Sequence, residues 1–211
     1  YIWLKNSFKK YPNCQNKLDP KLEGKFQNVK AKLAAFTHNK NEVIALYQDK
    51  ETEFAKYAVA AANFFNGNQE KSINLIKSLI NSYPKDPYYH EFLGEIYYFQ
   101  GDYVKAIKEQ KTAMSILSKD NDLHLMMLGT YLIAESSNRS IIESIGVLNK
   151  SLFLNRFNSY SWYLLAKAHA LNNNLPLAQY ASAERYYLSG NRTLALEFAK
   201  KAIKNIDKDT V

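Results

Sequence analysis

Apolar residues recur at helical spacing along most of the 211-residue chain. In one segment Ile73, Ile76, Leu79 and Ile80 follow each other at the intervals that place them on one helix face. Short polar turns rich in Asn, Gly and Asp separate such segments. This pattern predicts nine helices, near residues 52–66, 69–83, 87–100, 103–117, 121–136, 140–155, 159–172, 175–189 and 192–206. With only seven glycines and five prolines, the chain does not favour a β fold built from tight turns.

The turns repeat with a fixed period. Gly67 and Gly101 lie 34 residues apart, and Gly94 and Gly129 lie 35 residues apart at matching places in two predicted helices. A period near 34 residues, with a short turn between two helices, is typical of tetratricopeptide repeats. We therefore expect an all-α fold, a solenoid in which helix pairs stack into a right-handed superhelix.

The segment 86–107 matches the repeat best. Gly94, Ala106 and Ala113 are small residues that let paired helices approach closely, and the larger Leu93 and Tyr97 fill the remaining gaps. Such an alternation of small and large residues predicts a packed interface between the two helices of each pair.

Three places depart from the repeat. Gln110 stands where repeats often have an aromatic residue, and residues 136–140 predict a turn that is about three residues too long. The last two turns, at Asn173 and Gly190, are half a repeat apart. The array should therefore end on an extra helix that caps it.

The N-terminal part has a different character. Residues 1–50 hold ten lysines and four acidic residues, so they carry most of the net charge of +8. Asp19-Pro20 predicts a helix start, and residues 37–41 predict a break. One helical stripe is apolar: Leu22, Phe26, Val29, Leu33 and Phe36. We expect residues 1–50 to form a basic helical arm that links to an upstream domain, and residues 51–211 to form the repeat array with its capping helix.

In arrays of this kind the first helix of each pair lines a concave groove, and here those positions are unusually aromatic. The groove is predicted to contain Tyr57, Phe64, Phe65, Tyr88, Glu91, Glu95, Tyr98, Phe99, Met126, Tyr160, Tyr163 and Lys167. It lacks the Lys, Arg and Asn cluster that would hold a peptide's C-terminal carboxylate. Packing between helices is an open alternative for each of the aromatic residues.

No catalytic motif is found. The chain has no phosphate-binding glycine loop, no nucleophile elbow and no dinucleotide fingerprint. Residues 90–94 resemble the zinc-protease helix motif, but Gly94 replaces the second histidine, so a zinc ligand pair is missing. His90 is expected to pack as Trp162 does at the same repeat position. The single cysteine, Cys14, excludes an intramolecular disulfide. We expect no catalytic residue, metal or cofactor in this chain.

A narrower resemblance rests on residues 30–36, 57–60, 86–96, 162–166 and 178–184, together with Gly190, Ala195 and Ala199. From about residue 20 to 207 the chain resembles the C-terminal region of BepA/YfgC-like periplasmic zinc metalloproteases of bacteria. The resemblance implies a protein-binding domain in outer-membrane protein quality control, which packs on its own protease domain and presents clients or assembly machinery to it. It also implies a periplasmic location, and zinc held by a motif upstream of this chain.

Three other functions remain open. The chain could be a free-standing scaffold without a protease, which the upstream sequence would reveal. Residues 1–50 could bind nucleic acid, which would make binding steeply salt-dependent. The chain could itself be an enzyme, which the absent motifs disfavour. The partners we expect are proteins rather than nucleic acids, and no run of 18 apolar residues predicts a membrane-spanning helix.

Overall fold

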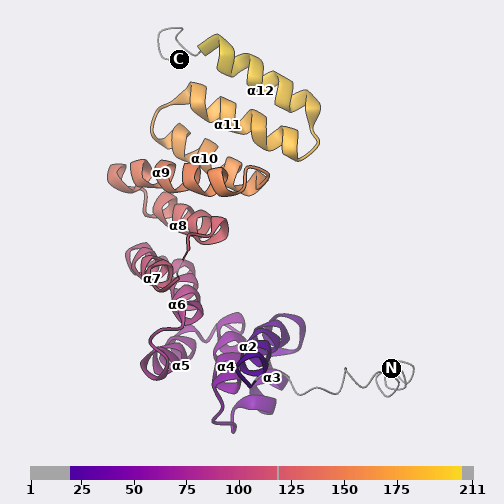
Figure 1. Cartoon of the computed structure of the whole chain (residues 1–211), viewed down its shortest axis with the longest axis vertical. Helices are drawn as coiled ribbons and strands as arrows, with labels where there is room; N and C mark the ends of the chain where they lie inside the picture. Colours follow the sequence, from indigo (N-terminus) through magenta and orange to yellow (C-terminus); the bar gives the residue numbers. More distant parts are fainter. Residues whose placement is uncertain (1–19, 118, 206–211) are drawn as a thin grey trace, which may run out of the picture. The chain divides into compact units, whose positions relative to one another are not determined.

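The computed structural model describes residues 20–117 and 119–205, and all regular elements in these ranges are α-helices (Figure 1). The expected all-α class is confirmed. The helices belong to two compact units, one ending at Ser82 and the other beginning at Tyr83. The first unit contains α2 (Pro20–Thr37), α3 (Lys40–Tyr47), α4 (Glu53–Phe65) and α5 (Gln69–Ser82).

Helix α4 is the centre of the first unit and packs against α2, α3 and α5. Its alanine-rich sequence leaves room for close neighbours, and α2 meets it with the fully buried Ala31 and Ala35. Buried polar groups are bonded: the Ser72 hydroxyl donates to the Ala60 carbonyl at 2.8 Å. Residues 20–47 are therefore part of the same compact unit as α4, and the division of the chain falls after Ser82 rather than at residue 50.

The second unit contains α6 (Pro87–Phe99), α7 (Tyr103–Ile116), α8 (Asp122–Glu135), α9 (Asn138–Leu154), α10 (Ser159–Leu171), α11 (Leu175–Leu188) and α12 (Arg192–Asn205). Helices α6 and α7, α8 and α9, and α10 and α11 pack as pairs. Helix α12 packs chiefly on α11. Every helix from α4 to α12 begins and ends within two residues of its predicted bounds, and the extra terminal helix is present.

A left-handed backbone residue ends five of these helices, α4, α6, α8, α10 and α11: Gly67, Gly101, Ser136, Asn173 and Gly190. At the end of α6 the Asp102 N–H donates to the Tyr97 carbonyl at 2.9 Å, and three of the other turns contain the equivalent bond. This bond across a left-handed residue satisfies a carbonyl that the helix end would leave free. The glycine period in the sequence is thus the period of the helix caps.

The turn predicted to be long at residues 136–140 is short, so that expectation was wrong. Ser136 adopts φ 63°, and helix α9 begins at Asn138 with Ser137 as its cap. The Ser137 hydroxyl oxygen accepts from the Ser140 N–H at 3.3 Å. The additional residues lengthen α9 to 17 residues rather than lengthening the loop.

The small residues of the repeat act as predicted. A Cβ atom on Gly94 would lie 3.2 Å from the Ala106 carbonyl oxygen, so α6 and α7 touch at backbone distance. Ala106 and Ala113 are fully buried in the same pair. Gln110, the departure from the repeat, is fully buried as well, and its amide donates to the His124 carbonyl at 3.1 Å. It thereby joins α7 to the start of α8.

Candidate functional site

Nine of the predicted groove residues lie in the second unit, and none of them is buried. Phe99, Tyr160 and Tyr163 are respectively 61%, 48% and 36% exposed. On α6 and α10 most of these residues are three, four or seven positions apart, so they lie on one side of their helix. The nine, which we call the aromatic face, are Tyr88, Glu91, Glu95, Tyr98, Phe99, Met126, Tyr160, Tyr163 and Lys167.

A ring contact joins this face to α8, and Tyr160 on α10 lies close to Tyr98 on α6. Tyr98 of α6 stacks on Tyr131 of α8 with centroids 5.0 Å apart and ring planes 27° apart. Burial raises the pKa of the Tyr98 hydroxyl, and the nearby Tyr160 and Tyr103 raise it further. Tyr160 in turn contacts Tyr163 at 5.7 Å. The aromatic face therefore runs from α6 past α8 to α10.

The face continues onto α11 and α12 through a cation. The Arg185 guanidinium lies over the Tyr163 ring at 4.6 Å and over the Tyr186 ring at 5.3 Å. Tyr186 then stacks on Phe198 at 5.4 Å. Contacts of this kind contribute about 0.5–1 kcal/mol when exposed. Sequence reasoning missed Arg185, because it lies on the second helix of its pair, where the repeat pattern predicts no groove residue.

The α6 end of the aromatic face is acidic. Glu91 and Glu95, one helical turn apart, are the only Asp, Glu, Lys or Arg residues in this helix. Burial raises the pKa of the Tyr131 hydroxyl, and the carboxylates of Glu95 and Glu91 raise it further. Since Lys167 and Arg185 supply positive charge on α10 and α11, the face is acidic at one end and basic at the other.

The groove does not extend onto α4 as predicted. Tyr57 and Phe64 are only 4% and 8% exposed, so both belong to the core of the first unit. Phe65 is half-buried, and its ring lies 4.2 Å from that of Phe36 on α2. The correction has a simple cause: α2 covers part of α4, which the local repeat pattern could not indicate.

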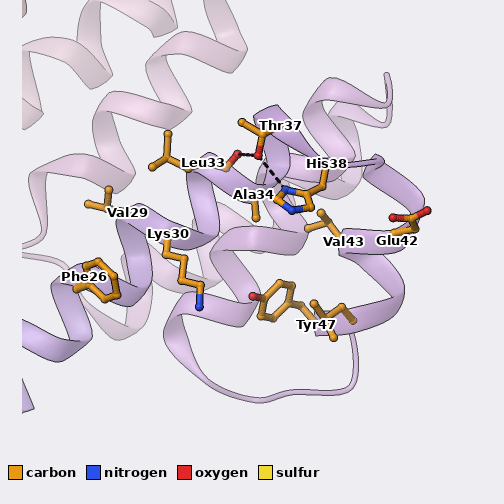
Figure 2. A pocket seen from close by; sticks show the side chains of 11 residues that line it. Phe26, Val29, Lys30, Leu33, Ala34, Thr37, His38, Glu42, Val43 and Tyr47 are labelled. Carbon is orange, nitrogen blue, oxygen red and sulfur yellow. Dashed lines mark hydrogen bonds between the residues drawn. The ribbon is translucent and has the colours of Figure 1, made fainter. Parts of the chain in front are cut away.

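The first unit has an apolar cavity of about 580 Å³ between α2 and α3 (Figure 2). Phe26, Val29 and Leu33 line it from α2, and Val43 and Tyr47 from α3. The three α2 side chains are 56–59% exposed, so the apolar stripe predicted on this helix faces outward. Its alanines face the core instead. This apolar surface is a second, separate candidate for binding.

Comparison with known proteins identifies the fold. No family model and no curated protein matches the chain. Solved structures do match, and among them is MamA, at 16% sequence identity and a TM-score of 0.57, with 69% of this chain and 93% of MamA covered. Yeast Tom70 matches at 18% identity and a TM-score of 0.66, with 84% of this chain and 39% of Tom70 covered. YrrB, described as a TPR protein with an unusual peptide-binding site, matches at 16% identity and a TM-score of 0.51, with 79% of this chain and 92% of YrrB covered. The fold is that of tetratricopeptide-repeat proteins. At these identities the similarity concerns the fold alone.

Within the tetratricopeptide pair α6–α7, His90 holds the two helices together. Its Nδ1 lies 2.7 Å from the Glu109 carboxylate, and both side chains are mostly buried. His169, which matches Tyr97 in the repeat, is buried, and burial lowers its pKa. Across the described ranges, no three His, Cys, Asp or Glu side chains come together as metal ligands. None of the helices described has the length and apolar character to cross a bilayer.

Proposed function

We propose that the chain is a protein–protein interaction module that binds a partner segment along the aromatic face of its second unit. One observation carries this proposal. Tyr98 on α6 and Tyr160 and Tyr163 on α10 are not buried, Tyr160 lies near enough to Tyr98 to raise the pKa of its hydroxyl, and the rings of Tyr160 and Tyr163 lie 5.7 Å apart. Grooves of this kind take extended or helical segments with apolar anchors.

The energetics favour the aromatic face over the basic N-terminal helix. An aromatic side chain buried at the centre of an interface contributes about 2 kcal/mol or more when it is truncated. A charge on an exposed rim contributes about 0–1 kcal/mol. The affinity should therefore depend on Tyr160 and Tyr163 more than on the lysines of residues 21–32, and salt should weaken binding only modestly.

The proposal is tested with peptides selected from a displayed library of random sequences. A selected peptide is measured by fluorescence polarisation against the wild type and against the double variant Tyr160→Ala/Tyr163→Ala. We expect the double variant to lose about thirtyfold in affinity, equivalent to about 2 kcal/mol. Phe153→Ala is the matched control, because Phe153 is an aromatic residue on α9 that is 89% exposed. It should bind as the wild type does.

Two results would overturn the proposal: a library that yields no binder, or equal losses from the Phe153 and the tyrosine variants. Affinity for nucleic acid that collapses with moderate salt would favour the basic helix α2 instead. Replacement of its lysines by Gln would then abolish binding.

The sequence resemblance supports a narrower proposal. We propose that the module belongs to a periplasmic zinc metalloprotease of the BepA/YfgC type, and that the zinc lies in a protease domain outside this chain. Its partners would be that domain and outer-membrane protein clients or assembly machinery. A free-standing scaffold is the alternative. Reading the complete open reading frame decides between them, because only the protease encodes an HExxH helix upstream.

A further inference from the structure

Tyr131 carries a hydroxyl group at a buried position that is apolar in the other repeats. The equivalent positions on α6 and α10 are Ile96 and Ala168, which are fully buried apolar residues. Tyr131 is fully buried too, and within the described part of the chain its hydroxyl has no hydrogen-bond partner. A buried hydroxyl without a hydrogen-bond partner lowers the stability of the folded state. Core packing therefore does not account for this residue.

The carboxylates of Glu91 and Glu95 lie near that hydroxyl and add to the rise of its pKa. Both side chains are half-buried on the same face of α6, a helix without Lys or Arg. Among residues 20–117 and 119–205 no cation forms an ion pair with Glu91.

Tyrosine rings lie close to this acidic pair. Tyr98 stacks on Tyr131, and Tyr160 of α10 lies near enough to Tyr98 to influence its hydroxyl. Partly desolvated carboxylates beside tyrosine faces form an environment that favours a cation over an anion or an apolar group.

We propose that Glu91, Glu95, Tyr98, Tyr131 and Tyr160 form a site for the side chain of a lysine or arginine in the bound partner segment. This inference rests on the proposed function and names the chemistry of the partner. The cation pairs with the Glu91 carboxylate, one helical turn from Glu95, and lies against the tyrosine rings. Its N–H groups also supply the donors that the buried Tyr131 oxygen lacks.

The peptide library tests the site directly. Peptides selected on the wild type should share a Lys or Arg at one position, and Glu91→Gln/Glu95→Gln should weaken such a peptide about tenfold. Glu143→Gln is the control, because it removes one negative charge from α9, outside the aromatic face. The affinity of this control variant for the basic peptide should fall by no more than about twofold.

A double-mutant cycle separates a direct contact from a general charge effect. In the peptide the shared basic residue is replaced by Gln, and each peptide is measured against the wild type and the Glu91→Gln/Glu95→Gln variant. If the site binds that residue, the basic peptide and its Gln form should bind the variant nearly equally. If the change in the peptide and the change in the protein reduce the affinity independently and additively, the inference is overturned.

Tyr131→Phe gives a second and independent test. Because it removes an unbonded buried hydroxyl, it should raise the unfolding midpoint, and it should also weaken binding of the basic peptide. A variant that is more stable and binds unchanged would exclude the hydroxyl from the site. Selected peptides without a common basic residue would overturn only this inference, whereas a library without binders would overturn the proposed function as well.

Discussion

Gly129 of α8 and Leu148 of α9 touch so closely that a Cβ atom on the glycine would lie 2.7 Å from Cδ2 and Cγ of the leucine. Leu148 is fully buried. Gly129→Ala should therefore destabilise the second unit by about 1–3 kcal/mol. Denaturant unfolding followed by circular dichroism measures this change.

Gly146→Ala is the control for that prediction. Gly146 lies inside α9, and no atom is within 4 Å of the position that its Cβ would occupy. Alanine there should stabilise the helix by about 0.5–1 kcal/mol. Stability changes of opposite sign for Gly129→Ala and Gly146→Ala would establish the close contact between α8 and α9, and equal changes would contradict it.

Ser136 ends α8 in a left-handed conformation, at φ 63°, where a side chain is strained. Ser136→Gly should therefore raise stability by about 0.5–1 kcal/mol, since glycine adopts this conformation without steric cost. Ser189 ends α11 at φ −83°, so Ser189→Gly should bring no gain. Thermal unfolding of the two variants, compared with the wild type, tests the difference.

His169 should make the stability of the second unit depend on pH. Burial lowers its pKa in the folded state below the ordinary value of 6.5, so the unfolded chain binds the proton more readily. The free energy of unfolding should be highest above pH 6.5 and should decrease as the pH falls through this value. His169→Phe should reduce this slope when unfolding is measured between about pH 5 and pH 8. An unchanged slope would contradict a role for His169.

Helix α2 should tolerate changes on its apolar stripe but not on its alanine side. Leu33 is 56% exposed, so Leu33→Ser should alter stability by no more than about 0.5 kcal/mol. Ala35 is fully buried, and Ala35→Leu should cost about 1–3 kcal/mol. Equal effects of the two variants in denaturant unfolding would show that α2 packs with another face.

Local pattern was sufficient to predict the helices and their ends. The glycines at 67 and 101 occupy left-handed caps, and Gly94 lies at a backbone contact, so these positions follow from steric rules that act within one repeat. The turn after α8 was mispredicted, because Ser136 takes the left-handed conformation that glycine takes elsewhere. The sequence alone does not distinguish that serine from a loop residue.

The candidate site was less accessible to prediction, because it depends on which helices cover one another. Tyr57 and Tyr160 both lie on first helices and have the same local signal. One is buried and the other is exposed, since α2 packs on α4. The alanines of α2 that make this contact appear in the sequence as a weak pattern beside its larger leucines and phenylalanines. Arg185 and Tyr131 became recognisable only through contacts between helices.

The separation of charge along the aromatic face has a consequence for selectivity. Carboxylates lie on α6, whereas Lys167 and Arg185 lie on α10 and α11. A segment with a basic residue near one end and an acidic residue near the other complements this face in one orientation only, because the reversed orientation sets like charges against each other. Two peptides of identical composition and opposite residue order would then differ in affinity, so the module would discriminate by the direction in which a partner chain runs.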